Sequence, residues 1–375
     1  MDKFQAAFAI PIIQHLVEGE QNQQKNRKIS SLIVTPTREL AIQIEENFKA
    51  YSKYTKLRTT VIFGGVSQHG QTRALSSGID ILVATPGRLL DLMNQGFISI
   101  NAVKYFVLDE ADRMLDMGFI HDIKKIIAEL PKKRQSLFFS ATMPQNILDL
   151  SRQILINPEK VAVNAVSSAA DTIQQFLYTT NKKNKKDLLL HILKDPKLDQ
   201  VLLFSRTKHG ADKIVRNLKK ENINCAAIHG DRNQNQRQRA LKDFKEGEIR
   251  LLVATDIAAR GIDISKLRYV INYDIPNEPE TYVHRIGRCG RAGEEGVSIS
   301  MSEPEENDYI KDIEKLIKQK IKVISSNPFP QTDKPMNNAE KKEFEKQKQK
   351  RKQEFFTNRN KNQNQKKSGF KRYRK

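Results

Sequence analysis

The sequence predicts an α/β protein made of two lobes, each built around an open parallel sheet. Short apolar runs of strand length alternate with segments of helical period along most of the 375 residues. Two short matches between the halves of the chain suggest duplicated lobes. A prior of about 150 residues per domain also gives two lobes.

The expected strands are apolar runs that occur in both halves of the chain. In the first half they are Ser31–Thr35, Thr60–Phe63, Ile79–Ala84, Tyr105–Leu108 and Ser136–Phe139. In the second half they are Val201–Phe204, Asn224–Ile228, Arg250–Ala254, Tyr269–Asn272 and Gly296–Met301. Two helical faces are expected, formed by Leu40, Ile44 and Phe48 and by Ala211, Ile214, Val215 and Leu218.

The internal matches share one offset. Leu-Ile-Val-Thr-Pro-Thr ends at Thr37 and Leu-Leu-Phe-Ser-Arg-Thr ends at Thr207, while Val-Ala-Thr occurs at 83–85 and again at 253–255. Each match is short enough for coincidence to be an alternative. Residues 158–172 interrupt the periodicity with polar and small residues, so we expect an N-terminal lobe over 1–157 and a C-terminal lobe over 173–330.

The remaining residues, 331–375, have the composition of a disordered basic tail. Of the net charge of +21, this tail carries +11, and it has almost no aliphatic residues to bury. Transient helix is expected at 339–355. Phe355, Phe356, Phe370 and Tyr373 lie among the basic residues and can stack on bases, although a solvated linker explains the composition equally well.

Composition excludes several classes of protein. No apolar run approaches the length of a membrane span. Cys225 and Cys289 are far apart, and the seven histidines are scattered, so neither a disulfide framework nor a zinc site is expected. The start of the chain lacks the pattern of a secretion signal. We expect a monomeric protein of the reduced cytoplasm.

An apolar strand ends in the acids Asp109, Glu110 and Asp112 at the edge where open sheets bind ligands. Asp can hold Mg²⁺ there through water, and Glu can orient or deprotonate an attacking water. Alone, such a pair more often caps a helix. Further polar segments occur at 140–142, 255–263 and 284–291 and favour a phosphoryl-transfer site instead. The arginines of segment 284–291 can neutralise the charge on a transferring phosphoryl group.

Over residues 6–330, the chain resembles the DEAD-box family of ATP-dependent RNA helicases. The segments that carry the resemblance are, in order, Val34–Leu40, Gly64-Gly65, Thr85–Arg88, Asp109–Asp112, Ser140–Thr142, Leu203–Thr207, Gln234–Arg237, Thr255–Asp263 and His284–Arg291. The short first lobe and the basic tail are most similar to the bacterial RhlE-type branch.

The resemblance implies two RecA-like lobes that close on ATP, with Mg²⁺, and on single-stranded RNA. It implies that Asp109 holds Mg²⁺ through water and that Glu110 positions the hydrolytic water. The nucleotide would further contact Asp263, Arg288 and Arg291, of which the two arginines reach the phosphates. The resemblance also implies that four residues couple ATP hydrolysis to closure of the lobes: Asp112, Ser140, Thr142 and His284.

The RNA contacts implied by the resemblance are Pro36, Thr37, Arg38, Gly65, Thr85, Arg88, Arg206, Gln234, Arg237 and Thr255. Most are hydroxyl groups, arginines or backbone N–H groups at strand ends and helix starts. These groups bind phosphate without reading any base, so sequence-independent binding is expected. For Thr37 or Thr85 alone, a helix cap is an equally good interpretation.

The chain departs from the family at its front. In the family, a loop ending Gly-Lys-Thr precedes the segment that is Ala6–Ile13 here, whereas this chain has Lys3-Phe4-Gln5 and no Gly-x-Gly-Lys-Thr anywhere. That loop cradles the β-phosphate, and Lys3 is out of register to replace it. The upstream element that reads adenine is also absent. We therefore expect an N-terminally truncated member with very weak ATP binding and no appreciable ATPase activity.

A smaller departure is Cys289, where the family usually has threonine, and we expect it to be neutral. Two alternatives to a helicase stay open. The chain is an ATP-independent RNA-binding or annealing protein that acts through its second lobe and tail, or it is a non-functional fragment.

The missing loop predicts a difference in stability between the lobes. In the family fold, the strand that carries the loop lies inside the first sheet. Its loss exposes unpaired backbone, a large penalty against a total stability of about 5–15 kcal/mol. We expect residues 1–157 to be unstable alone and residues 173–324 to fold independently. Circular dichroism melts of both pieces check this, and a cooperative melt of residues 1–157 would contradict it.

Overall fold

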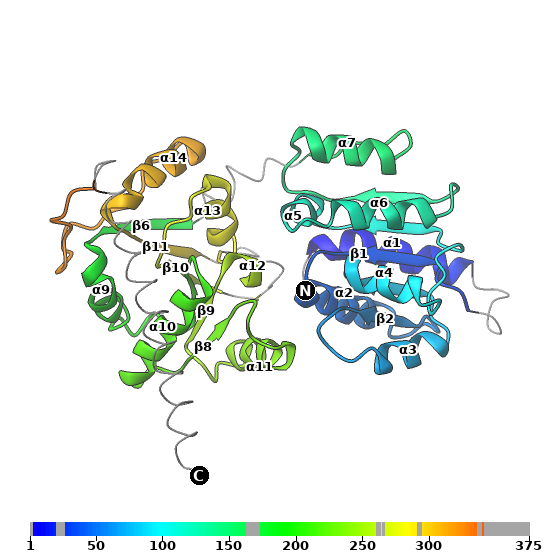
Figure 1. Ribbon diagram of the computed structural model, residues 1–375, viewed down its shortest axis with the longest axis horizontal. Coiled ribbons are helices and arrows are strands. Elements are labelled where there is room, and N and C mark those ends of the chain that lie inside the picture. Colours follow the sequence, from blue (N-terminus) through cyan, green and yellow to red (C-terminus); the bar gives the residue numbers. More distant parts are fainter. Residues whose placement is uncertain are drawn as a thin grey trace, which may run out of the picture.

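The computed structural model describes residues 3–19, 27–162, 173–259, 264, 267–290, 295–335 and 340. These residues form two α/β lobes that lie side by side, each with a parallel sheet between layers of helices (Figure 1). The predicted fold class is confirmed. Within the described residues, no helix combines the length and the apolar character needed to cross a membrane.

The first lobe has a five-stranded parallel sheet with the order β2-β3-β1-β4-β5. Its strands are β1 Ser31–Val34, β2 Thr59–Ile62, β3 Ile81–Ala84, β4 Tyr105–Leu108 and β5 Gln135–Phe138. Its helices are α1 Lys3–Glu18, α2 Arg38–Tyr51, α3 His69–Ser76, α4 Pro86–Asn94, α5 Ala111–Asp116, α6 Ile120–Glu129 and α7 Gln145–Ile154. All five runs predicted in this half are strands, with ends within two residues.

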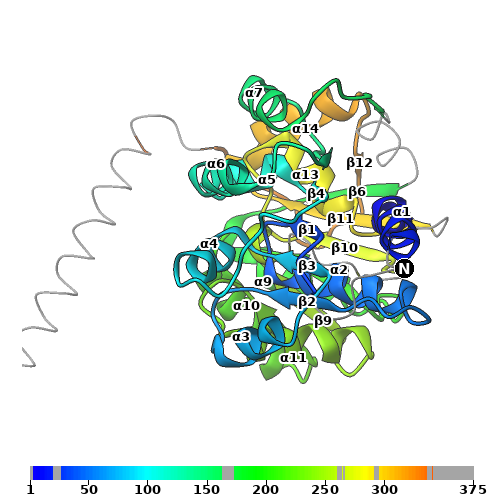
Figure 2. The same ribbon diagram turned by 90° about the vertical axis from the view of Figure 1, so that its right-hand side faces the viewer.

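Helices cover both faces of this sheet (Figure 2). Leu32 and Val34 of β1 pack in one core with residues of α4 and α6, and Ile33 packs in another with residues of α1 and α2. Burial on both faces explains why the central strands read as continuous apolar runs. Strand β5 lies at an edge of the sheet and is only partly buried, with Gln135 exposed.

The second lobe has a seven-stranded parallel sheet with the order β12-β6-β11-β10-β7-β9-β8. Its strands are β6 Ile173–Thr179, β7 Val201–Phe204, β8 Cys225–Ile228, β9 Leu251–Ala254, β10 Tyr269–Asn272, β11 Gly296–Ser302 and β12 Lys322–Val323. Its helices are η1 Lys182–Asn184, α9 Lys185–Ile192, α10 Lys208–Lys220, α11 Gln234–Lys245, α12 Asp256–Ala259, α13 Pro279–Ile286, η2 Pro304–Glu306 and α14 Asn307–Ile317.

Strands β6 and β12 are the two that the sequence did not predict. Polar residues interrupt β6, where Gln174 is exposed between buried Ile173 and Gln175. Strand β12 has two residues, both exposed, and pairs only at the edge with β6. Neither has the apolar run by which the other strands were found.

Contacts of the second lobe continue past its predicted end at residue 330. The backbone N–H of Gln331 donates to the Thr179 carbonyl at 3.1 Å. Those of Thr332 and Asp333 donate to Asn181 Oδ1 at 3.0 and 2.9 Å. Most of the predicted tail, including all but one residue of its expected helix, and residues 163–172 of the predicted linker lie outside the described residues.

Candidate functional site

The carboxyl ends of the strands in the first lobe face the second lobe, and four polar side chains join the lobes there. Glu39, in the first turn of α2, is 3% exposed. Its Oε1 accepts from Gln234 Nε2 at 3.0 Å, and its Oε2 accepts from Arg237 Nη2 at 2.8 Å. Arg38 Nη1 donates to Gln234 Oε1 at 3.2 Å. We call Arg38, Glu39, Gln234 and Arg237 the lobe-bridging cluster.

Three members of this cluster were predicted RNA contacts, whereas Glu39 was not. Nothing in the sequence separates Glu39 from an ordinary acid in the first turn of a helix, where acids are favoured in any case. Its role appears only when the start of α11 lies against the start of α2. The cluster therefore brings together predicted RNA contacts from two parts of the chain.

Arg38 lies tightly against the predicted contact Gly65. A Cβ atom at residue 65 would lie 2.2 Å from Arg38 Nη1, and Gly65 has φ of +80°, so only glycine fits. Burial lowers the pKa of Arg38, and the positive charges of Arg237 and Arg88 lower it further, against the opposing effect of Glu39. Three guanidinium groups near two carboxylates, Glu39 and the Asp91 side chain 3.5 Å from Arg88 Nε, leave an excess of positive charge, which favours an anion.

Arg88, in the first turn of α4, is held toward this region by its neighbours. Its Nη2 donates to the Val66 carbonyl at 3.1 Å, and its Nη1 donates to Gln71 Oε1 at 3.3 Å. Gln71 in turn hydrogen-bonds both backbone groups of Phe63. The orientation of Arg88 is therefore fixed by the segment that contains Gly65.

The two predicted threonine contacts differ in their bonding. Thr37 caps α2, and its Oγ1 accepts from the Leu40 N–H at 3.3 Å. Thr85 occupies the corresponding position before α4 but makes no side-chain capping bond. Both residues and Pro36 are buried. The hydroxyl of Thr85 is thus the freer of the two for a ligand.

The second lobe places its remaining predicted RNA contacts at strand ends as well. Thr255 follows β9, and its N–H donates to the Ile228 carbonyl at 3.3 Å. Arg206 follows β7 but is engaged within the lobe, with Nη2 at 2.7 Å from the Ile275 carbonyl and 2.6 Å from Glu306 Oε1. Glu306 is buried, and its Oε2 lies 2.8 Å from Lys185 Nζ. An anion would have to share Arg206 with Glu306.

Asp109 and Glu110 follow β4 at the edge that faces the second lobe. Asp109 is buried, and its N–H donates to the Val34 carbonyl at 3.0 Å. Glu110 has φ of +54° and ψ of +50°, a left-handed conformation that costs a non-glycine residue about 1 kcal/mol. Its Oε2 is buried without a hydrogen-bond partner among the described residues, while Arg113 Nη1 lies 3.6 Å from it.

Asp112 joins the end of β4 to the end of β5. Its Oδ2 accepts from the Thr142 N–H at 2.9 Å and from Thr142 Oγ1 at 3.0 Å. The Asp112 N–H donates to Ser140 Oγ at 3.2 Å, and Ser140 Oγ donates to the Thr142 carbonyl at 2.7 Å. Three of the four predicted coupling residues therefore form one network.

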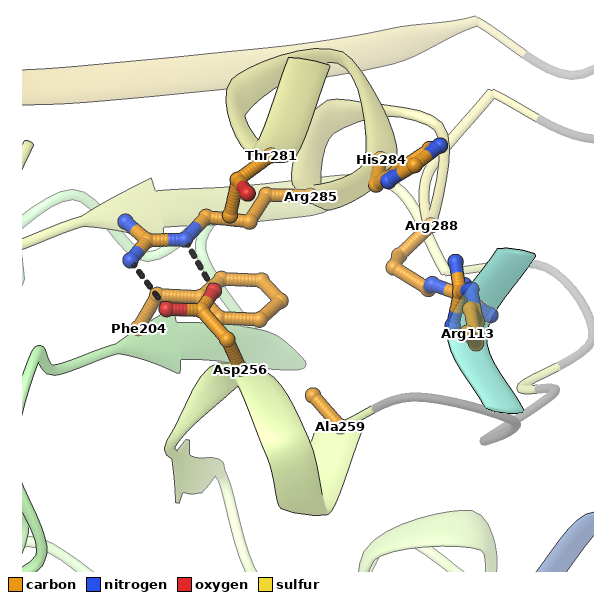
Figure 3. Close-up of a pocket in the computed structure, with 8 residues that line it drawn as sticks. All are labelled: Arg113, Phe204, Asp256, Ala259, Thr281, His284, Arg285 and Arg288. Carbon is orange, nitrogen blue, oxygen red and sulfur yellow. Dashed lines mark hydrogen bonds and ion pairs between the residues drawn. The ribbon is translucent and has the colours of Figure 1, made fainter. Parts of the chain in front are cut away.

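The fourth, His284, lines a small pocket between the lobes (Figure 3). The pocket has a volume of about 20 Å³. Arg113 of α5 is its contribution from the first lobe, and Arg288, which follows α13, points toward Arg113 from the second. Two guanidinium groups thus face each other across the lobes, with Glu110 3.6 Å from that of Arg113, and the phosphate role of Arg288 stays a prediction.

Arg285 lies in the same arginine-rich segment but has a structural role. It is 2% exposed, and its Nε and Nη2 contact Asp256 Oδ1 and Oδ2 at 2.6 and 2.8 Å (Figure 3). Its Nη1 donates to the Asp274 carbonyl at 2.6 Å, and its guanidinium lies 5.0 Å from the centre of the Phe204 ring. The interpretation of all three arginines of this segment as phosphate ligands is therefore wrong for Arg285.

Of the other predicted nucleotide contacts, Asp263 and Arg291 lie outside the described residues.

Known proteins resemble this chain over most of its length. It is 40% identical over 341 residues to "DEAD-box ATP-dependent RNA helicase CshA" of Geobacillus kaustophilus. This alignment covers 91% of this chain and 71% of the relative. The chain belongs to the DEAD-box helicase family. Two family models match it, the DEAD/DEAH box helicase over residues 6–150 and the helicase conserved C-terminal domain over residues 184–293.

Other DEAD-box relatives agree. The chain is 42% identical over 316 residues to "ATP-dependent RNA helicase CshA" of Limosilactobacillus reuteri, which is 84% of this chain and 62% of the relative. The chain thus spans about three fifths of the length of the first relatives that it matches. Among solved structures, Dbp5 of S. cerevisiae bound to RNA and ADP BeF3 matches with a TM-score of 0.75 and 30% identity, over 85% of this chain and 82% of Dbp5.

DEAD-box helicases use ATP, and the residues of this chain fit part of that ligand. Glu110 Oε2, which is ion-paired with Arg113 but accepts no hydrogen bond from a described residue, suits a bound water, and buried Asp109 suits a water-mediated Mg²⁺. Among the described residues, no group of three acids, histidines or cysteines forms a metal cage. The residues named here account for a metal contact and a positioned water, and do not by themselves form a triphosphate cradle. The side chain of Lys3 lies outside the described residues.

The Arg285–Asp256 pair predicts a measurable loss of stability. We expect Asp256→Ala to destabilise the second lobe by about 3 kcal/mol, because it leaves a buried guanidinium without its carboxylate. Cys225 and Cys289 are both buried in this lobe, and burial raises the pKa of Cys225 to about 11. Thiol labelling during urea unfolding therefore reports on the second lobe.

Asp308→Ala is the matched control, because it removes a carboxylate from an exposed pair with Lys311 and should cost less than about 1 kcal/mol. Equal labelling midpoints for the two variants would contradict the role given to Arg285.

Proposed function

We propose that this chain acts as the RNA-binding core of an ATP-dependent RNA helicase that remodels short RNA duplexes by closure of its two lobes. The observation that carries the proposal is the lobe-bridging cluster. There, RNA contacts expected from α2 and α11 meet around one buried carboxylate. A ligand that binds both halves of this surface stabilises the closed arrangement, because it adds contacts that separated lobes cannot make together.

RNA is the proposed partner, and its backbone is the proposed ligand. Support comes from the positive charge around Arg38, Arg88 and Arg237 and from the free hydroxyl of Thr85. Pro36, Thr37, Gly65 and Gln234 complete this surface, and Thr255 and Arg206 extend it in the second lobe. These groups offer donors to phosphate oxygens and no pattern that distinguishes bases, so binding is independent of sequence.

For ATP hydrolysis we propose that Asp109 holds Mg²⁺ through water and that Glu110 orients the attacking water. Arg288 is proposed to reach the phosphates from the second lobe, together with Arg291 and Asp263. The network of Asp112, Ser140 and Thr142 gives these groups a physical link, because it ties the strand that bears the carboxylates to the next strand end. We propose His284 as its partner across the pocket.

Finer assignments stay predictions. They are membership of the RhlE-type branch, a truncated N-terminus, a monomeric state and a cytoplasmic location. The relatives described above carry the name CshA. The second candidate function is ATP-independent RNA binding or annealing, which needs only the surface around the lobe-bridging cluster.

We expect the 375-residue chain to bind RNA without ATP and to show no appreciable ATP turnover, because no glycine-rich loop cradles the phosphates. Phosphate release in the presence and absence of single-stranded RNA measures this. RNA-stimulated turnover that Glu110→Gln abolishes would reject the expectation and establish the chain as an active helicase.

The tail gives a prediction about salt. If the basic tail dominates RNA binding, deletion of residues 333–375 should sharply reduce the slope of log affinity against log salt concentration, because fewer counterions are released. Fluorescence anisotropy between 50 and about 200 mM salt covers the useful range. An unchanged slope would assign the binding to the lobes.

A further inference from the structure

A second pocket lies at the opposite edge of the first sheet. It has a volume of about 350 Å³ and opens among the segments that lead into β1, β3 and β4. Because the carboxyl ends of these parallel strands face the second lobe, their amino ends point away from it. Figure 2 looks toward this side of the first lobe. The pocket is therefore separate from the lobe-bridging cluster and from the pocket of Arg288.

The walls of this pocket combine an aromatic ring with polar groups and cations. Ile29, Ile79 and Ile98 are buried and form its apolar floor. Phe97 is 51% exposed at its rim, beside Ser99 and Asn101. Lys28 supplies positive charge, whereas Arg27 is paired with Asp80. Such a pocket can take a flat apolar ring whose edge carries hydrogen-bonding groups.

The pocket lies within a row of lysines along the amino ends of the strands. Lys56 precedes β2, Lys28 precedes β1, Lys104 precedes β4, and Lys132 and Lys133 precede β5. All five are exposed, and within the part of the chain that the structure describes none has an ion-pair partner. With strands about 4.8 Å apart, the row extends over roughly 19 Å.

Acidic groups do not cancel this charge. Asp80, which precedes β3 within the row, is paired with Arg27 and accepts the N–H of Arg58. Glu129, at the end of α6, is exposed near Lys132 and Lys133 in the sequence. Glu18, at the end of α1, is also exposed near the start of β4, because its neighbour His15 stacks on Tyr105. Five lysines without an ion-pair partner against two exposed carboxylates still leave a positive strip.

We propose that this pocket and the lysine row form a second RNA-binding site. One base of a single-stranded segment enters the pocket and stacks on Phe97, and its phosphates lie along Lys28 and Lys104. A positive groove with an exposed aromatic side chain is the general arrangement that binds single-stranded nucleic acid. Ser99 and Asn101 can hydrogen-bond the edge of the base. An acidic peptide would use the lysines and the polar groups but, being rich in Asp and Glu, would offer no flat ring to stack on Phe97.

The site needs neither ATP nor lobe closure, because all of its residues belong to the first lobe. It therefore extends the proposed function without depending on the cluster at the other edge. The experiment uses the 375-residue chain and fluorescein-labelled single-stranded RNA. We expect Phe97→Ala to weaken RNA affinity by about fivefold to a hundredfold, the range for the loss of one stacked base.

The matched control is Ile156→Ala, which removes another exposed apolar side chain of the first lobe that neither lines the pocket nor precedes a strand of the lysine row. We expect it to leave affinity unchanged. Lys28→Glu combined with Lys104→Glu should weaken binding and reduce the salt slope, whereas Lys311→Glu, an exposed lysine on α14, should not. Circular dichroism confirms that each variant is folded.

Photocrosslinking with 4-thiouridine RNA, mapped by mass spectrometry, locates the contact. We expect crosslinks in residues 97–101 that persist in Arg88→Ala, a variant that removes a proposed RNA contact at the other edge of the sheet. If Arg88→Ala weakens binding but Phe97→Ala does not, and no crosslink maps to 97–101, the second site is wrong and the proposed function stands. Binding of poly-glutamate that depends on Phe97, without a crosslink to RNA, would replace RNA by an acidic partner.

Discussion

The arrangement of the molecule depends on the buried carboxylate of Glu39. One carboxylate accepts from Gln234 and Arg237 of the second lobe, while the adjacent Arg38 donates to Gln234. A buried ion pair contributes little net stability, but removal of one partner is costly because it leaves the other charge buried and unpaired. Contacts of this kind specify how two surfaces meet more than how tightly they hold. They place the strand ends of both lobes at one shared surface.

Polar networks at the strand ends set the positions of the other groups. Asp112 with Thr142 joins two strands of the first lobe, and Arg285 with Asp256 fixes the segment from which Arg288 projects. Both networks lie behind the groups that face the gap between the lobes. The geometry of Glu110 and Arg288 is therefore determined by side chains that need not contact any ligand.

Much of the fold was readable from the sequence because the strands of a doubly covered sheet are short apolar runs. The runs that became β1 and β9 are buried on both faces, and their pattern left little ambiguity. Strands β6 and β12 were not predicted, because polar residues interrupt β6 and β12 is only two residues long. At the site, residue types suggested Asp109 and Arg88, but Glu39 and Asp256 act through partners distant in the sequence. Arg285 and Arg288 differ in role only through what surrounds them, which no local pattern records.

The open edge of the first sheet has a consequence for how copies of this protein meet. An unpaired edge strand is a template for a strand of another molecule. Here β5 is preceded by Lys132, Lys133 and Arg134, so two copies that approach edge to edge in antiparallel fashion bring positive charges near each other's backbone. The net charge of +21 repels a second copy as well, and this repulsion is strong in dilute electrolyte and screened in concentrated electrolyte. Colloidal stability of the protein is thus tied to the ionic strength of its surroundings.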